Sequence, residues 1–196
     1  MAPSSFLDEI LRKGLHLASV AIVLVYAFFG KQIVLYFMTV YLVLILLIEH
    51  MRLDRGFRLP VLHYLLRRKE ETSIGGHVYF TLGAIVAVSV FSQSVAYAAI
   101  LMATFGDMSA ALIGKSIGRT RIFRGGKSLE GCAAEFIVDL IIGYAFLSNW
   151  SIAFAMALVA TFVETSFEKI DDNLTIPVFS GFVAELLLIL TTYVRL

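Results

Sequence analysis

The sequence is poor in charge and nearly devoid of cysteine. Only 16% of its 196 residues are charged, whereas about a quarter is usual in a soluble domain. This shortage excludes an ordinary soluble enzyme and a disordered chain, and the single cysteine, Cys132, excludes a scaffold held by internal disulfides. A net charge of +1 gives no overall attraction to nucleic acid. With 59% hydrophobic residues, the composition predicts a small integral membrane protein.

Long apolar runs recur along the whole chain. They predict an all-α membrane protein with about seven transmembrane helices in a single domain, residues 1–196. The expected spans are Gly14–Phe29, Ile33–Ile48, Val78–Phe91, Val95–Ile113, Gly131–Leu147, Ser151–Val163 and Pro177–Val194. Several are shorter than the ~20 residues that cross the hydrocarbon core, which favours local thinning, helix ends inside water-filled cavities, or oligomerisation, for example as a homodimer.

The positive charges gather on one side of the expected membrane. All Lys and Arg residues except Lys31 and Arg195 fall before the first span or after the second, fourth and sixth spans. The positive-inside rule then places the amino terminus in the cytoplasm and the carboxyl terminus outside. The sequence therefore predicts a multi-pass protein of a prokaryotic cell membrane or an ER-type membrane.

Acidic residues are expected in the cytoplasmic half of the spans. Asp107 lies in the fourth span and Glu164 ends the sixth. Glu185 lies about two turns into the seventh, as a catalytic residue or as the partner of an intramembrane donor. Glu135 and Asp139 are four residues apart and share one face of the fifth helix. Because intramembrane carboxylates usually face a cavity, a partner or an ion, the pattern predicts a polar bowl open to the cytoplasm.

The densest polar segment, residues 106–131, combines glycines with five basic residues. Glycines let backbone N–H groups approach phosphate oxygens, Lys and Arg neutralise the phosphate charge, and nearby carboxylates can hold Mg²⁺. The segment is not a P-loop, because both GKS triplets lack the first glycine of GxxxxGK[ST]. A basic loop is also favoured by topology alone, and the Gly114–Gly118 spacing suits helix packing as well.

The spacing of these residues resembles a known family. DxxAxxxGxxxG from Asp107 and KSxEG from Lys127 are similar to the nucleotide-site signature of CTP-dependent lipid-alcohol kinases. That family includes dolichol kinase, phytol kinase and yeast-type CTP-dependent diacylglycerol kinase, within the CDP-diacylglycerol synthase-like superfamily. RKxxH from Arg12 and an acidic loop at 164–177 fit the same pattern. The KD…PGHGG…DR signature of CDP-diacylglycerol synthases is absent, which favours phosphoryl over cytidylyl transfer.

The resemblance implies transfer of the γ-phosphoryl group of CTP, with Mg²⁺, to the hydroxyl of a polyprenol or similar long-chain lipid alcohol. The residues expected to hold CTP are Gly114, Lys115, Gly118, Arg119, Lys127, Ser128 and Glu130. Those expected to hold Mg²⁺ are Asp107, Asp172 and Asn173. The expected catalytic carboxylates are Asp107, Glu135, Asp139 and Glu164, and the sequence does not rank the last three as acceptor of the alcohol proton.

Two other functions use similar residues. A CDP-lipid cytidylyltransferase would release pyrophosphate with a phospholipid acid such as phosphatidate. A cation- or proton-coupled transporter would use the intramembrane acids and need no triphosphate-binding loop. Membrane lipids are expected partners in every case, and nucleic acid in none.

Overall fold

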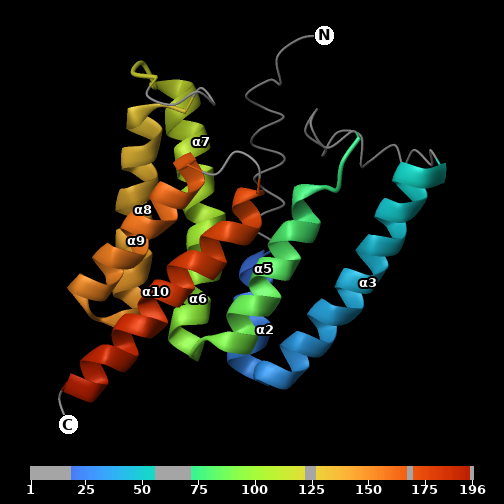
Figure 1. Cartoon of the computed structure of the whole chain (residues 1–196), viewed down its shortest axis with the longest axis horizontal. Helices are drawn as coiled ribbons and strands as arrows, with labels where there is room; N and C mark the ends of the chain where they lie inside the picture. The colour runs from blue at the N-terminus through green and yellow to red at the C-terminus, as the bar shows by residue number, and fades with distance from the viewer. Residues whose placement is uncertain (1–18, 56–71, 122–126, 167–169, 195–196) are drawn as a thin grey trace.

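The described part of the chain is almost entirely helical. The computed structural model describes residues 19–55, 72–121, 127–166 and 170–194. The elements are α2 (Val20–Phe29), α3 (Lys31–Arg55), α5 (Gly76–Val90), α6 (Gln93–Leu101), the π-helical turn η3 (Met102–Gly106), α7 (Asp107–Ser116), α8 (Leu129–Leu147), α9 (Trp150–Ser166) and α10 (Asp172–Val194). Figure 1 shows a bundle of roughly upright helices with α3 at one edge. The all-α prediction is confirmed for these residues.

Each predicted span coincides with helical residues, although the bounds differ. The fourth span is a single helical run, Gln93–Ser116, in which α6 and α7 are joined by the π turn. The helix of the second span, α3, continues to Arg55 rather than ending at Ile48. Residues 14–18 of the first span lie outside the described residues. Within the described residues, three helices, Lys31–Arg55, Gln93–Ser116 and Asp172–Tyr193, are long and apolar enough to cross a membrane. The chain is therefore an integral membrane protein.

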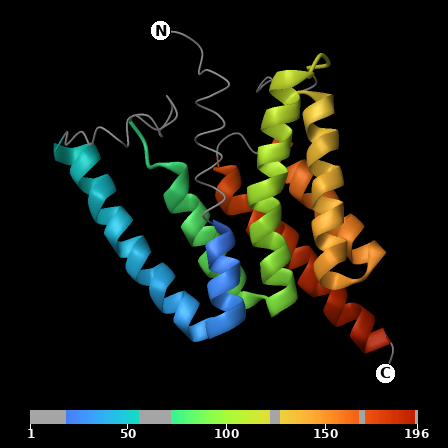
Figure 2. The same ribbon diagram turned by 180° about the vertical axis from the view of Figure 1, so that it is seen from behind.

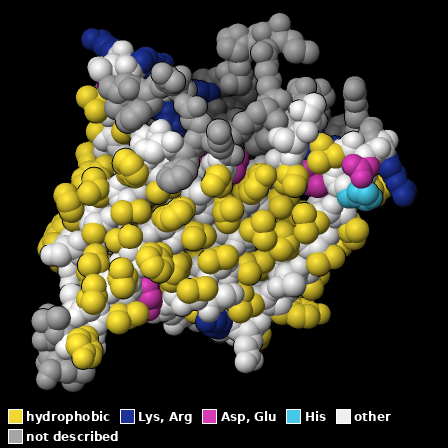
Figure 3. All heavy atoms as spheres, viewed as in Figure 1, with side chains coloured by type: hydrophobic (Ala, Val, Ile, Leu, Met, Phe, Trp, Pro, Cys, Tyr) yellow, Lys and Arg dark blue, Asp and Glu magenta, His cyan; other side chains and the backbone are white. Residues whose placement is uncertain are grey.

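Apolar side chains cover the outside of the bundle. Along α3 only Val34, Met38, Ile45 and Glu49 are buried, and most of the large apolar side chains between them are exposed. Figure 3 shows a broad hydrophobic band across the face, with Lys and Arg mainly along its upper edge. Exposing this area to water would cost about 25 cal/mol per Å², whereas lipid tails accept it.

The centre of the bundle is built from small residues of α6. Ala96, Ala98 and Ala99 are fully buried, and α6 packs against α2, α5, α8 and α10. Small side chains let helix backbones approach closely, which is how membrane helices gain packing energy. Tyr97 joins this core edge-on to Tyr26 and Phe146, with ring centroids 5.2 and 5.8 Å apart. The close packing fixes the η3 turn, which follows α6 and precedes Asp107, against α8 and α10.

The described charges are concentrated at one end of the bundle. Helices α3, α7 and α9 end there, and α5, α8 and α10 begin there, as Figures 1 and 2 show. Every described Lys and Arg except Lys31 lies at this end. Lys31 lies at the opposite end, where its Nζ donates to the Ser89 carbonyl at 2.7 Å. The charge asymmetry is thus part of the fold, and its assignment to the cytoplasm stays a prediction.

The last helix begins earlier than the sequence suggested. Asp171 caps it, because its Oδ1 accepts from the backbone N of Asn173 at 3.2 Å. Pro177 lies inside the helix and cannot donate a backbone hydrogen bond. Gly83 of α5 packs here, since a Cβ on it would lie 2.8 Å from Pro177 Cγ and 2.9 Å from the Asn173 carbonyl. The expected loop 164–177 is therefore shortened from both sides.

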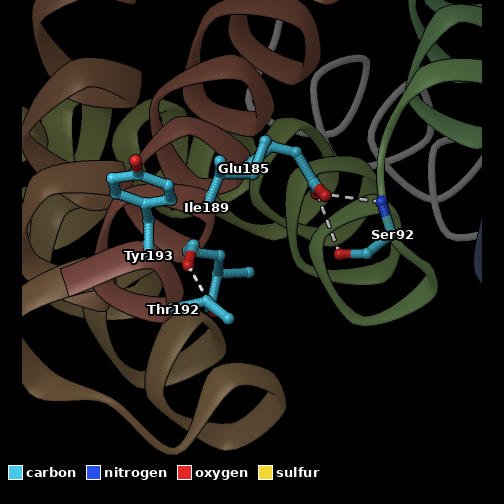
Figure 4. A pocket seen from close by; sticks show the side chains of 6 residues that line it. Ser92, Glu185, Ile189, Thr192 and Tyr193 are labelled. Atoms are coloured by element: carbon cyan, nitrogen blue, oxygen red, sulfur yellow. Dashed lines mark hydrogen bonds between the residues drawn. The ribbon is translucent and has the colours of Figure 1, made fainter. Parts of the chain in front are cut away.

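This early start moves Glu185 to the opposite end of the bundle from Asp107. Glu185 lies about 20 Å along α10 from Asp172, at 1.5 Å per residue. Its Oε2 accepts from both the N and the Oγ of Ser92, each at 2.9 Å. Figure 4 shows this contact beside a surface pocket of about 450 Å³ lined by Ser92, Glu185, Leu188, Ile189, Thr192 and Tyr193. The expectation that Glu185 belongs to the polar bowl is wrong, because it pairs with a helix terminus instead.

Replacing Glu185 with glutamine should weaken the fold without affecting the site. The glutamine side chain lacks the negative charge that favours the N–H and O–H donors of Ser92 at the start of α6. We expect Glu185→Gln to lower the free energy of unfolding by about 1 kcal/mol, with catalytic activity retained. Thermal unfolding in detergent measures the first effect. Loss of activity in a folded Glu185→Gln protein would contradict this role.

Candidate active site

Three carboxylates from separate parts of the chain meet at the charged end of the bundle. Asp107 begins α7, Glu164 lies in the last turn of α9, and Asp172 begins α10. Each offers one oxygen, and these oxygens lie within 4.8 Å of one another. Asp107 and Glu164 are buried, with only 5% and 6% of their surface exposed. Hard cations such as Mg²⁺ prefer carboxylate oxygens, so this group can hold a divalent cation.

The π-helical turn places Asp107 at this position. Such turns insert a residue into a helix and are frequent at functional sites. Gly106 ends the turn, and a Cβ on it would collide with Asp139 Oδ1. The absent side chain thus lets Asp139 of α8 approach the backbone just before Asp107. The local sequence does not predict the π turn, which is known only from the structure.

Two further carboxylates lie deeper in the bundle. Glu135 and Asp139 of α8 are fully buried, and none of their carboxylate oxygens has a hydrogen-bond partner among the described residues. The negative charge of Glu135 interacts with the carboxylates of Glu164, Asp139 and Asp107. The expected shared face of Glu135 and Asp139 is confirmed, and it faces the group formed by Asp107, Glu164 and Asp172.

Among the described basic residues, Lys127 has an ion pair with this group. Its Nζ lies 3.0 Å from Glu164 Oε1 and also donates to the Glu164 backbone carbonyl. Burial alone would lower the pKa of Lys127, but Glu164, followed by Asp172 and Glu135, attracts the ammonium and raises the pKa overall. Lys127 is therefore positively charged at neutral pH, immediately before α8.

The signature glycines pack around Ser128. The Ser128 Oγ caps α8 by accepting from the Gly131 N at 3.1 Å. A Cβ on Gly118 would collide with the Gly114 carbonyl and lie 2.5 Å from the Ser128 Oγ, and a Cβ on Gly131 would lie 2.8 Å from the Ala110 carbonyl. These glycines therefore let α7 and α8 meet closely, and their expected contact with phosphate stays a prediction.

Hydrogen bonds join the described residues after α7 to those at the start of α8. Arg121 and Ser128 form a β-bridge, and the Leu129 N donates to the Thr120 carbonyl at 2.9 Å. The Glu130 carboxylate accepts from the Thr120 N at 3.1 Å. Glu130 of α8 thus contacts the backbone at Thr120, shortly after α7 ends. Of the other residues expected to bind CTP, Lys115 and Arg119 are found at the same end.

Alanine at Gly118 should be far more disruptive than alanine at Gly114. The added Cβ at Gly118 would overlap a backbone carbonyl, whereas at Gly114 its nearest neighbour is the Ser128 Oγ at 3.1 Å. We expect Gly118→Ala to lower stability by about 1–3 kcal/mol and Gly114→Ala to lower it much less. Thermal unfolding of both variants measures the difference. Equal effects would show that the packing around Ser128 does not depend on Gly118.

Asn173 lies beside the carboxylate group but is held by its neighbour. Its Nδ2 donates to Asp171 Oδ1 at 2.7 Å, and its backbone N donates to Asp172 Oδ1 at 3.0 Å. Asp172 lies in the candidate metal group, and so does Glu164, which is one of the three carboxylates that the sequence leaves open as acceptor of the alcohol proton. The role of Asn173 as a metal ligand stays a prediction.

A second polar cluster connects α3 to α5 at the same end. The Glu49 carboxylate, only 2% exposed, accepts from Arg52 at 2.5 Å and lies 3.4 Å from His77 Nε2. Arg52 also donates to the Ser73 carbonyl at 2.6 Å. Glu49 lies near the end of α3, and His77 lies at the start of α5. Their contact ties the end of α3 to the segment before α5.

Comparison with known proteins identifies relatives over most of the chain. Protein MJ1137 of Methanocaldococcus jannaschii, described as uncharacterized, is 30% identical over 181 residues, covering 89% of this chain and 92% of the relative. CTP-dependent diacylglycerol kinase 1 of Eremothecium gossypii is 30% identical, covering 60% of this chain and 45% of the relative. The kinase of the same name from Saccharomyces cerevisiae is 28% identical, covering 60% and 50%.

This chain thus spans about half the length of the two kinases. No protein-family model matches the chain, and no solved structure is significantly similar to it. The relatives nevertheless agree with the resemblance carried by the segments from Asp107 and Lys127. The chain belongs to the same family as the M. jannaschii protein MJ1137 and is homologous to CTP-dependent diacylglycerol kinases.

Proposed function

We propose that this protein is a membrane-embedded, Mg²⁺-dependent lipid kinase that transfers the γ-phosphoryl group of CTP to the hydroxyl of a lipid alcohol. A polyprenol or related isoprenoid alcohol is the proposed substrate class, and diacylglycerol is the alternative named by the relatives. The whole chain would act as one kinase domain, with residues 106–131 as its nucleotide-site segment.

The observation that carries the proposal is the meeting of Asp107, Glu164 and Asp172 beside the Lys127 ammonium. Phosphoryl transfer needs positioning and charge neutralisation more than covalent chemistry. The carboxylates fit a divalent cation, because Glu164 Oε2 is buried in the group without a hydrogen-bond partner among the described residues. Asp107, Glu164 and Asp172 would hold Mg²⁺, which would neutralise the phosphate charge. Lys127, with Lys115 and Arg119 in the outer part of the site, would hold the triphosphate.

We assign the alcohol proton to Glu135. Glu164 is engaged with Lys127, and Asp139 lies one turn deeper along α8 against Gly106. Glu135 is close enough to attract Lys127 and has no hydrogen-bond partner of its own among the described residues. The alcohol O–H bond breaks with its proton passing to Glu135. The alcohol oxygen then bonds to the γ-phosphorus, and the bond to the β-phosphate oxygen breaks to release CDP.

The proposed orientation puts this end of the bundle toward the cytoplasm, where CTP is available. The positive-inside rule supports it, since the described Lys and Arg residues other than Lys31 lie at this end. The lipid tail would stay in the bilayer along the apolar surface of the bundle, with its hydroxyl at the carboxylates. A homodimer remains compatible with the short helices α2, α5 and α9.

A transfer assay tests the proposal. Purified protein in detergent with Mg²⁺ would receive γ-labelled CTP or γ-labelled ATP together with polyprenols, phytol, geranylgeraniol or diacylglycerol. The expected result is label in an organic-phase lipid phosphate, with CTP and with an isoprenoid alcohol. If only diacylglycerol is labelled, the proposed kinase activity stands, and the substrate is diacylglycerol rather than an isoprenoid alcohol.

Two outcomes would replace the proposal. Pyrophosphate release on adding phosphatidate, without label in any alcohol, would identify a cytidylyltransferase. Ion flux in proteoliposomes without nucleotide, and no transfer in either assay, would identify a transporter. Mg²⁺ dependence is tested in the same assay by chelation with EDTA and restoration with excess Mg²⁺.

A further inference from the structure

The Lys127 ammonium is paired with one of the candidate metal ligands, Glu164. Its Nζ is 3.0 Å from Glu164 Oε1, and Glu164 is also a member of the group formed with Asp107 and Asp172. The other oxygen, Glu164 Oε2, is buried without a hydrogen-bond partner among the described residues. One carboxylate therefore serves both a lysine and the candidate cation site.

Several features hold Lys127 in this position. Its second hydrogen bond, to the Glu164 backbone carbonyl, fixes the head group at the end of α9. Asp172 and Glu135 also attract it, so its electrostatic partners overlap with the proposed metal ligands. About a third of the side chain, 32%, is exposed, which leaves the ammonium accessible to an anion arriving from the charged end.

We infer that Lys127 is an internal counter-ion that is exchanged during binding. In the nucleotide-free protein its ammonium neutralises Glu164, and a divalent cation must compete with it for this carboxylate. The oxygens of a nucleoside triphosphate draw Lys127 away and make Glu164 available to the cation. The inference rests on the proposed function of this site. It adds that Lys127 neutralises Glu164 before nucleotide binds and that the divalent cation does so afterwards.

Positive coupling between metal and nucleotide follows from this exchange. An ammonium and a divalent cation cannot both be neutralised fully by one carboxylate. A triphosphate that binds Lys127 therefore raises the affinity for the cation, and the cation raises the affinity for the triphosphate by the same factor. The site then binds its metal weakly until the nucleotide is present.

Binding of Mn²⁺ alone to the nucleotide-free protein tests the inference. The protein in lipid nanodiscs would be titrated with Mn²⁺, with free Mn²⁺ measured by its EPR signal. Lys127→Met removes the charge with little change of shape, and we expect it to tighten Mn²⁺ binding by about fivefold or more, the lower range of a coupling effect. Lys127→Arg keeps the charge, and Lys31→Met removes a charge from the opposite end; both should bind Mn²⁺ as the wild type does.

Unchanged or weaker Mn²⁺ binding in Lys127→Met would overturn the inference, as would equal tightening in Lys127→Arg. A measurement on the wild type guards against a variant that does not fold. Saturating Mn²⁺ should displace Lys127 from Glu164 and raise its rate of acylation, followed by mass spectrometry, and an unchanged rate would also overturn the exchange. If Mn²⁺ binding changes as expected but no lipid is phosphorylated, the exchange stands and the proposed kinase fails.

Discussion

Asp107→Asn should abolish phosphoryl transfer while leaving the protein folded. Asp107 is one of three carboxylates whose oxygens meet within 4.8 Å, and asparagine offers a neutral oxygen where a hard cation needs a charged one. Electrostatic stabilisation of the transferring group is usually the largest catalytic contribution. We expect the rate to fall on the order of 10³-fold, measured as label transferred from γ-labelled CTP to the lipid.

Asp54→Asn is a matched control for this variant. Asp54 lies at the same end of the bundle, is exposed and pairs with His50 at 2.8 Å, but is not part of the carboxylate group. It should transfer label at the wild-type rate. Thermal unfolding of both variants would separate catalysis from folding. A folded Asp107→Asn protein with wild-type activity would remove Asp107 from the site and with it the proposed metal group.

Much of the fold was predictable because lipid imposes a simple pattern. Apolar runs must be helical to satisfy their backbone groups in a membrane, so the predicted spans coincide with helices. The grouping of Asp107 with Asp172 was anticipated through the resemblance, since no local spacing connects residues so far apart in sequence. Glu164 was recognised as a site residue, but its contact with Lys127 depends on how α9 meets the start of α8.

The predictions from sequence are wrong or incomplete where tertiary packing determines the local structure. Pro177 suggested the start of a helix, yet the side chain of Asp171 begins α10 earlier and Gly83 accommodates the proline. Because α10 begins earlier, Glu185 lies outside the expected bowl and accepts a hydrogen bond from Ser92 instead. The π turn before Asp107 is likewise invisible in local propensity, because it accompanies the approach of Asp139 to Gly106.

Glu135→Gln should reduce turnover strongly without weakening CTP binding. Glutamine cannot accept the alcohol proton, and loss of a general base costs about 10²–10⁴-fold in rate. Because Glu135 acts on the alcohol in the proposed reaction, kcat should fall while the KM for CTP stays near the wild-type value. Steady-state kinetics with the labelled assay measure both.

Glu135→Gln should leave the fold intact and raise its thermal stability. Glu135 is fully buried, and its close electrostatic neighbours include the carboxylates of Glu164 and Asp139. A buried, unpaired carboxylate is costly, whereas the glutamine amide can donate to its acidic neighbours. We therefore expect Glu135→Gln to unfold at a higher temperature than the wild type. Asp139→Asn is the comparison: it lies one turn deeper and should lower kcat less, and the reverse order would transfer the role of base from Glu135 to Asp139.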